Sequence, residues 1–227
     1  MSGSDSGVAV PQRRADAGGR DLKLFYGFIA LLVAVGAGLV LLWPASPAPQ
    51  PLTSEAQSHR RLTAFALTNQ LGQLTTSAGV AGKFLVVNFI HTSCSISCLQ
   101  VNHQMAEVQR LTKAQPDVQL LSLTVDPASD TPPVLAKFGA QFGTDPNRWQ
   151  MLTGRKSDLY ALIATSFLGR APAAQADLMP GGFADTDRIA VVDRSGRVRR
   201  YFDGMRTETP AAIVTFLDAL RSESEKI

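Results

Sequence analysis

The feature that most constrains the fold is an apolar run that leads directly into two cysteines. The run, Phe84–Ile90, has the length of a strand and is rich in Val, Phe and Ile. Such a run is typical of a strand in the middle of a sheet that is covered on both faces. Cys94 and Cys98 follow it, and they are the only cysteines among the 227 residues.

A helix is expected to begin at or just after these cysteines. Cys98, Val101, Met105 and Val108 recur at helical spacing, with polar residues between them. The local pattern therefore predicts a strand, a Cys-x-x-x-Cys segment and a helix. Two cysteines cannot hold together a disulfide-rich fold, so we expect this pair to carry out chemistry or to bind a metal.

The rest of the chain alternates predicted strands with predicted helices and then closes with a hairpin and a helix. A small hairpin is expected at 65–74, strands at 118–125 and 149–152, helices after the N-cap Thr131, at 157–167 and at 209–221, an irregular stretch at 169–184 and a hairpin at 188–202. This order favours a mixed α/β sheet in a thioredoxin-like sandwich.

The N-terminal part has a different composition. Residues 1–23 lack an apolar period and are expected to form a disordered tail. Residues 24–43 are uncharged, and at ~1.5 Å per residue this stretch spans roughly 30 Å, the thickness of a bilayer core. We therefore predict one transmembrane anchor, followed by a Pro-rich tether at 44–60 and a thioredoxin-like domain at 61–227.

The charges around the predicted anchor indicate its orientation. Four basic residues lie before it, whereas 44–59 contains no Lys or Arg. This asymmetry places the N-terminus in the cytoplasm and the C-terminal domain outside, in the periplasm of a bacterial inner membrane. The alternative is a cleaved signal peptide, but the apolar run exceeds the usual length of about 7–15 residues. The net charge of +3 is too small to indicate nucleic-acid binding.

Cys94 and Cys98 have the spacing of a reactive pair. Residues four apart on a helix lie on one face, and a disulfide accepts a Cα separation of ~4.4–6.8 Å. At a helix N-terminus, the free N–H groups and the macrodipole stabilise a thiolate. The pair is thus expected either to cycle between dithiol and disulfide or to hold a soft ion. A purely structural disulfide or two buried thiols are the alternatives, but a disulfide that closes so short a loop restrains the unfolded chain little.

Two histidines near the cysteines suggest a zinc site that helical geometry rules out. At about 100° per residue, His103 lies half a turn away from Cys94 on a continuous helix. A tetrahedral site made of His91, Cys94, Cys98 and His103 is therefore not expected. His103 is predicted to lie at the surface and His91 to pack near the thiols. Copper(I), a soft ion, suits two thiolates better.

With these motifs in place, the chain resembles the Sco (SenC-like) family of membrane-anchored thioredoxin-fold proteins associated with copper-site assembly in cytochrome c oxidase. The likeness covers roughly residues 62–220. Besides the anchor and the Cys-x-x-x-Cys segment, Val125–Pro132 resembles the family's V-D-P-x-x-D-T-P, and Trp149–Gly154 resembles its strand ending in L-T-G. The resemblance implies that Cys94 and Cys98 bind copper.

The resemblance breaks down at the family's third copper ligand, a histidine. That histidine stands eight residues before the residue that opens the late D-x-x-G turn, here Asp193, and this position holds Asp185. No histidine follows His103, and Leu99 replaces the proline that usually follows the second cysteine. Because a carboxylate is a hard donor, we expect weaker copper binding than in relatives with the histidine. Met179 offers a thioether nearby, although ordinary packing is the favoured interpretation.

Two functions remain open. The first is a copper chaperone that uses Cys94 and Cys98 and has a copper-containing oxidase subunit as partner. The second is a thiol–disulfide oxidoreductase that acts on another periplasmic thiol protein, in which Cys94 attacks and Cys98 resolves the mixed disulfide. The chaperone is favoured over the enzyme. A peroxiredoxin is not expected, because His91 occupies the place of that class's threonine.

Overall fold

The computed structural model describes residues 60–93, 96–168 and 187–224. These residues belong to the second of two compact units, Leu52–Ile227. The predicted tail and anchor, and the tether before Arg60, lie outside the described residues. None of the helices in the described ranges combines the length and the apolar character that crossing a membrane requires.

The described residues form one seven-stranded sheet in the order β2-β1-β5-β4-β3-β6-β7. The strands are β1 Ala66–Asn69, β2 Leu74–Thr76, β3 Phe84–Ile90, β4 Val118–Thr124, β5 Trp149–Thr153, β6 Arg188–Val192 and β7 Val198–Asp203. The α-helices are α3 Ile96–Leu111, α4 Pro132–Ala140, α5 Lys156–Leu162 and α6 Thr209–Ser224. The predicted mixed α/β sheet is therefore confirmed.

The middle of the sheet is parallel and its two sides are antiparallel. β3 pairs in parallel with β4, and β4 pairs in parallel with β5. β6 joins the other edge of β3 in the antiparallel direction, and β1 joins β5 in the same way. Because Ile90 pairs with Thr124, the carboxyl ends of β3 and β4 meet at one edge of the sheet. The segment that leads to the cysteines leaves the sheet there.

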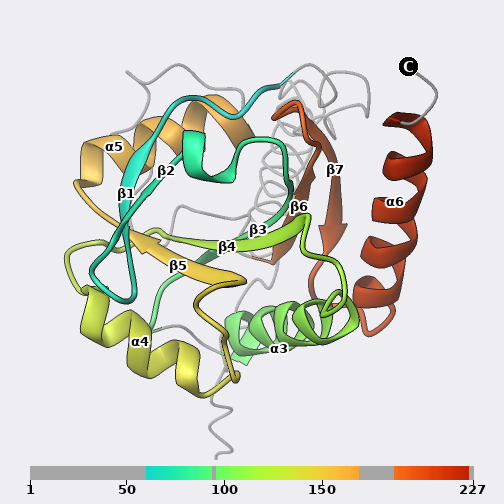
Figure 1. The fold of residues 1–227 in the computed structure, drawn as a ribbon. Coiled ribbons are helices and arrows are strands. Elements are labelled where there is room, and N and C mark those ends of the chain that lie inside the picture. The colour runs from blue at the N-terminus through green and yellow to red at the C-terminus, as the bar shows by residue number, and fades with distance from the viewer. Residues whose placement is uncertain (1–59, 94–95, 169–186, 225–227) are drawn as a thin grey trace, which may run out of the picture. The chain divides into compact units, whose positions relative to one another are not determined.

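Both faces of β3 are covered, which explains its continuous apolar sequence. Phe84, Val86 and Ile90 pack with apolar side chains of α3, α4 and α6. The alternate residues Leu85 and Val87 pack with α5 and the turn of helix that follows it. Figure 1 shows α3 and α4 on one side of the sheet and α5 on the other. All seven residues of β3 are buried.

The first described residues lie against the last hairpin of the sheet. Arg61 and Arg197 form an isolated antiparallel bridge. The N–H of Leu62 donates to the carbonyl of Gly196 (2.7 Å), and the N–H of Val198 donates to the carbonyl of Arg60 (2.9 Å). The turn itself is the predicted D-x-x-G turn, in which Gly196 adopts a φ of 79° that favours glycine.

Two local expectations need correction. Thr131 stands at the N-cap of α4 but makes no side-chain capping bond, and Pro133 at the second helical position lacks one of the two N–H groups that such a bond could use. The single helix predicted at 157–167 is instead α5 followed by a π-helix at Ile163–Leu168. There the hydroxyl of Thr165 donates to the carbonyl of Ala161 (2.7 Å), a side-chain bond that competes with regular helical bonding.

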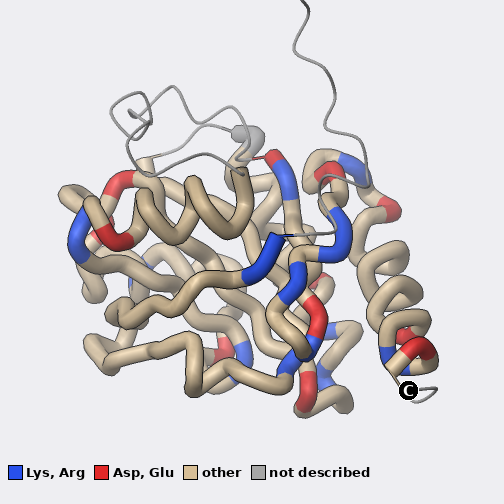
Figure 2. The backbone as a smooth tube through the Cα atoms, turned by 90° about the horizontal axis from the view of Figure 1, so that it is seen from above, with Lys and Arg blue, Asp and Glu red and all other residues tan. Residues whose placement is uncertain are grey.

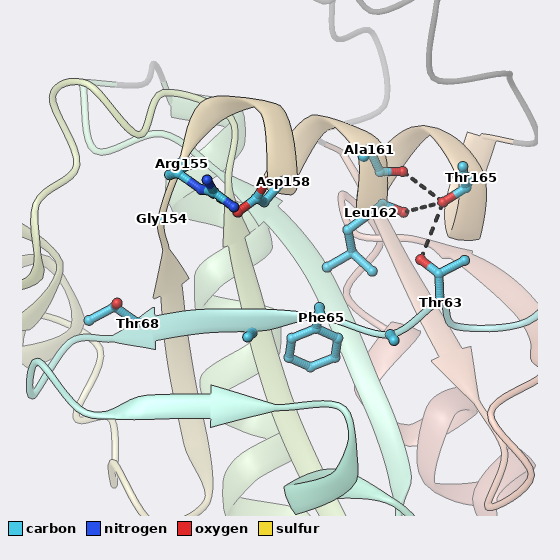
Figure 3. Close-up of a pocket in the computed structure, with 11 residues that line it drawn as sticks. Thr63, Phe65, Thr68, Gly154, Arg155, Asp158, Ala161, Leu162 and Thr165 are labelled. Carbon is cyan, nitrogen blue, oxygen red and sulfur yellow. Dashed lines mark hydrogen bonds and ion pairs between the residues drawn. The ribbon is translucent and has the colours of Figure 1, made fainter.

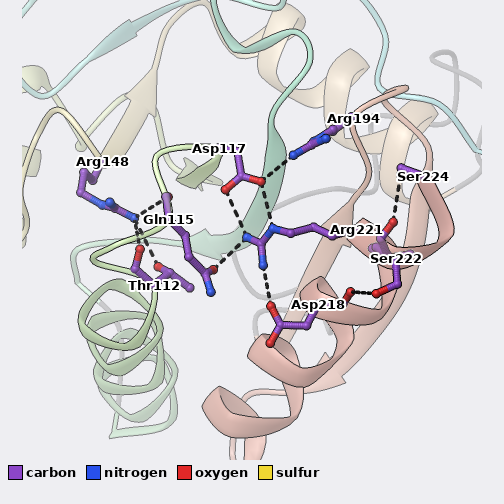
Figure 4. A network of polar contacts seen from close by, with 10 residues as sticks. Thr112, Gln115, Asp117, Arg148, Arg194, Asp218, Arg221, Ser222 and Ser224 are labelled. Carbon is purple, nitrogen blue, oxygen red and sulfur yellow. Dashed lines mark hydrogen bonds and ion pairs between the residues drawn. The ribbon is translucent and has the colours of Figure 1, made fainter. Parts of the chain in front are cut away.

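Charged residues of both signs lie along β7 and in the last turns of α6, and Figure 2 shows blue and red segments together near the C-terminal end of the chain. Arg199 on β7 pairs with Asp193 (3.2 Å) and with Glu223 at the end of α6 (3.0 Å). A second network centres on Asp117, which precedes β4 (Figure 4). Its carboxylate accepts hydrogen bonds from Arg221 of α6 (3.0 Å) and from Arg194 (2.7 Å). These ion pairs link α6 to β7, and they link α6 and the β6–β7 turn to the segment before β4.

Replacing Arg221 with glutamine is expected to lower the free energy of unfolding by about 1 kcal/mol at pH 7. The hydrogen bonds from Arg221 hold the pKa of Asp117 below its ordinary value, although burial raises it in part and Arg194 lowers it further. Because the pKa of Asp117 is lower in the folded chain than the value of about 3.9 in the unfolded chain, its ionised carboxylate stabilises the fold at pH values above about 3.9. This stabilisation is lost as the pH falls through the folded-state pKa of Asp117. Urea unfolding at pH 7 and at pH values below 4 measures the difference, which should shrink in acid.

The matched control for this change is Arg155→Gln. Arg155 pairs with Asp158 on the surface, with its side chain 83% exposed, so its removal should cost less. An Arg221→Gln deficit that stayed constant down to the acid transition would contradict the assignment to Asp117.

Candidate functional site: the buried cysteine in the first turn of α3

Cys98 lies in the first turn of α3, immediately beyond the end of β3. Its side chain is 2% exposed, and it is disulfide-bonded. The chain contains one other cysteine, Cys94, which lies outside the described residues. The position of Cys98 in the first helical turn agrees with the sequence prediction, and it puts this residue among the first positions of the helix, whose backbone N–H groups have no partner within the helix.

Two polar groups lie next to the sulfur of Cys98. The carbonyl oxygen of His91 is 3.8 Å from the Sγ atom. The side-chain Nδ2 of Asn102, one helical turn further along α3, is also 3.8 Å from Sγ and donates to the carbonyl of Cys98 at 2.8 Å. The sulfur therefore faces one backbone acceptor and one amide donor in a buried environment.

Asn102 is the end of a chain of buried side chains that crosses the sheet. Nδ2 of Asn88 on β3 donates to Oδ1 of Asn102 (3.3 Å). The hydroxyl of Ser122 on β4 donates to Oδ1 of Asn88 (2.6 Å), and Nε1 of Trp149 on β5 donates to the oxygen of Ser122 (2.8 Å). Asn88, Asn102, Ser122 and Trp149 are all 0% exposed. Sequence analysis missed this chain, although a lone asparagine in the apolar run Phe84–Ile90 was a signal for it.

A buried carboxylate fixes the segment that precedes the cysteines. Asp130, 1% exposed, accepts hydrogen bonds from the N–H (3.2 Å) and the hydroxyl (2.5 Å) of Thr92. It also accepts a bond from the hydroxyl of Thr124, the last residue of β4. Asp130 is the second aspartate of the V-D-P-x-x-D-T-P segment, so this motif holds the exit from β3 against the end of β4.

The two histidines near the cysteines lie on different elements: His103 is on α3, and His91 follows the end of β3. His103 is exposed, and its ring packs edge-on against Phe142 with the ring centroids 5.2 Å apart. Five residues at about 100° each turn it by roughly 140° from Cys98, so the prediction of a surface histidine is confirmed. His91 is half-buried, and its Nδ1 is 3.4 Å from the hydroxyl of Ser93. Among the described residues, no three His, Cys, Asp or Glu side chains gather where they can hold a metal ion.

The residues considered for the third ligand position are only partly described. Asp193 opens its turn as predicted, and its carboxylate accepts bonds from the N–H groups of Ser195 and Arg197, each at 2.9 Å. Asp185 and Met179 lie outside the described residues. The alignment that equates Asp185 with the family's histidine therefore stays a prediction.

A groove of about 610 Å³ lies between the segment that leads into β1 and α5 (Figure 3). The ion pair of Arg155 with Asp158 lies at this groove, and Thr63 and Thr165 face each other with their hydroxyl oxygens 3.3 Å apart. Of the described residues, His91 and Asn102 lie next to the buried sulfur of Cys98, and neither lines this groove, which is therefore lined by other residues.

Comparison with known proteins identifies relatives whose sequences match most of this chain. The model of the family SCO1/SenC matches residues 53–220. The SCO1 protein homolog of Bacillus subtilis is 31% identical over 137 residues, which cover 58% of this chain and 68% of that protein.

Two solved structures extend the likeness to three dimensions. A SCO1/SenC family lipoprotein from Bacillus anthracis has a TM-score of 0.61 at 26% identity and covers 71% of this chain and 95% of its own. Bradyrhizobium japonicum ScoI, solved with copper bound, has a TM-score of 0.54 at 25% identity and covers 70% and 98%. With a family model that spans most of its length and a sheet that matches these structures, the chain belongs to the SCO1/SenC family.

Proposed function

We propose that this protein acts in the assembly of the copper site of cytochrome c oxidase and carries copper as its cargo on Cys94 and Cys98. The observation that carries the proposal is the buried, disulfide-bonded Cys98 in the first turn of α3, in a chain of the SCO1/SenC family. A relative with the same fold, the Bradyrhizobium protein, binds copper in its solved structure.

The donor atoms suit copper(I). Two thiolates are soft ligands, and Cu(I) prefers them to carboxylate or amide oxygen. The disulfide must first be reduced: an external dithiol gives it two electrons and two protons and becomes a disulfide itself, which leaves two thiols on this chain. Cu(I) then displaces the two protons. A third donor would come from Asp185, Met179 or His91. With a carboxylate in this place, copper is held less tightly than by a histidine, which suits a protein that passes its cargo on.

A thiol–disulfide oxidoreductase is the second candidate, and the disulfide at Cys98 favours it. In its reduced state, the thiolate of Cys94 would attack a disulfide of a periplasmic partner and release one partner thiol. Cys98 would then displace the second partner thiol and re-form the disulfide of this chain. Each cycle moves two electrons to the partner, and an external dithiol would have to replace them. Burial of Cys98 suits the resolving role.

The proposed site of action is the periplasmic face of a bacterial inner membrane, where residues 24–43 would anchor the chain and an oxidase subunit would be the partner. The uncharged stretch and the basic residues before it support this placement. Retention of the chain in membranes washed with alkaline carbonate is the expected observation, and its release into the wash would exclude the anchor.

Titration with Cu(I) in competition with a chelator tests the copper function. The reduced full-length chain in detergent is expected to retain one Cu(I), and the Cys98→Ser variant is expected to lose it to the chelator. The matched control is Met205→Leu, which replaces an exposed methionine (42% exposed) two residues after β7 and should leave retention unchanged. An Asp185→His variant should hold Cu(I) more tightly.

The same titration separates the two candidates. No retention by the unmodified chain, together with rapid reduction of a model disulfide, would replace the copper function with the oxidoreductase. An unchanged affinity in Asp185→His would show that this position does not face the thiols.

A further inference from the structure

The hydrogen bonds that link Trp149, Ser122, Asn88 and Asn102 all donate in one direction, toward Cys98. The indole N–H of Trp149 can only donate, so the hydroxyl of Ser122 accepts from it and must donate onward. It donates to Oδ1 of Asn88, which turns the Nδ2 of Asn88 toward Oδ1 of Asn102. Nδ2 of Asn102 is then the group that faces Cys98. A donor-only residue on β5 thus sets the orientation of an amide beside the sulfur.

This arrangement is costly unless every member has a partner. Buried amides and hydroxyls lose their hydration, and a core of apolar side chains would avoid that cost. Each of the four hydrogen-bonded side chains is paired with the next, from β5 through β4 and β3 to α3. The amide of Asn102 has two N–H groups, and the carbonyl of Cys98 takes one at 2.8 Å. The sulfur, at 3.8 Å, is the other acceptor that the structure places beside Nδ2.

An N–H donor next to a sulfur acts differently on the two redox states. Reduction by two glutathione molecules breaks the S–S bond of this chain, places two electrons and two protons on its sulfurs and releases glutathione disulfide. The reduced sulfur carries more electron density than a disulfide sulfur, so it accepts a hydrogen bond more strongly. A fixed donor therefore favours the reduced state.

We propose that Asn102 is a positioning residue that shifts the redox equilibrium of the Cys98 disulfide toward the dithiol, with its amide oriented by Asn88, Ser122 and Trp149. The inference rests on the proposed function, because copper loading and thiol exchange both require the reduced pair. It adds to that function a residue outside the Cys-x-x-x-Cys segment, one that determines how readily the reduced pair forms.

The test is the equilibrium of the full-length chain in detergent with glutathione buffers, with the dithiol fraction counted by alkylation and mass. Asn102→Leu keeps a similar volume and removes the amide. Its equilibrium constant for reduction is expected to fall about threefold to tenfold, which corresponds to a potential about 15–30 mV more negative. Asn102→Ala removes the same donor and serves as the second variant if leucine prevents folding.

The control is Thr112→Val, which removes a buried hydroxyl that donates to the carbonyl of Val108 (2.8 Å) at the other end of α3. It should destabilise the fold without moving the redox equilibrium. An unchanged equilibrium in both Asn102 variants, or an equal shift in Thr112→Val, would overturn the inference. Cu(I) retention by the unmodified chain decides the proposed function separately, because the glutathione equilibrium contains no metal.

Discussion

Replacement of Asp130 with alanine is expected to lower the free energy of unfolding by about 3 kcal/mol. The carboxylate is buried and accepts bonds from the N–H and hydroxyl of Thr92 and from the hydroxyl of Thr124. Removing the carboxylate leaves these buried donors without an acceptor and out of reach of water. Hydrogen bonds to a charged group are worth roughly 1.5–3 kcal/mol each, and the unpaired donors add a further cost. Urea unfolding at neutral pH measures the loss.

The same change is expected to loosen the segment between β3 and the cysteines, because Thr92 stands two residues before Cys94. After reduction, alkylation of the thiols should therefore be faster in Asp130→Ala than in the unmodified chain. Asp145→Ala is the matched control: Asp145 is exposed, and its carboxylate accepts one bond, from the N–H of Asn147 (3.0 Å). Equal stability losses in the two variants would contradict the role given to Asp130.

Gly204→Ala is expected to cost about 2 kcal/mol, although it adds a single methyl group. A Cβ at this position would lie 2.7 Å from the carbonyl oxygen of Asp187 and 2.9 Å from the side chain of Val101 on α3. The N–H of Gly204 also donates to that carbonyl at 2.6 Å, so the backbone has little freedom to move away. The methyl group would push the end of β7 away from the first turns of α3.

Thermal and urea unfolding of Gly204→Ala should be compared with Gly79→Ala. A Cβ at Gly79 would meet only the hydroxyl oxygen of Thr76, at an ordinary contact distance of 3.7 Å. The control should therefore retain the stability of the unmodified chain or gain slightly from reduced unfolded-state entropy. If both variants were equally stable, the close approach of β7 to α3 would not be a constraint.

The order of strands and helices could be predicted because each depends on local pattern. The apolar run at Phe84–Ile90 has enough apolar residues to be buried on both faces, and the spacing of Val101, Met105 and Val108 fixes the buried side of α3. The turn at Asp193–Gly196 follows from its own side-chain bonds and from a glycine with positive φ. None of these depends on distant parts of the chain.

The environment of Cys98 could not be predicted in the same way. Asn88, Ser122 and Trp149 belong to three different strands. The parallel register sets Asn88 opposite Ser122, and Trp149, opposite Leu120, reaches Ser122 with its indole N–H. Likewise, Asp130 was visible as part of a motif, but its partner Thr92 lies 38 positions earlier. The sequence predicts which residues react, whereas the sheet pairing decides which side chains surround Cys98.

The bridge between Arg61 and Arg197 has a consequence for the order in which the chain folds. Residues 60–62 bind the β6–β7 turn, and β1 pairs with β5 across more than 80 positions. Contacts of such long sequence separation form late and slow the folding of a domain. β1 can therefore join the sheet only after β5 is present, and residues 60–62 gain their partners only after the β6–β7 turn has formed. A chain truncated before Gly196 would therefore leave the backbone groups of residues 60–62 without the partners that the complete sheet gives them.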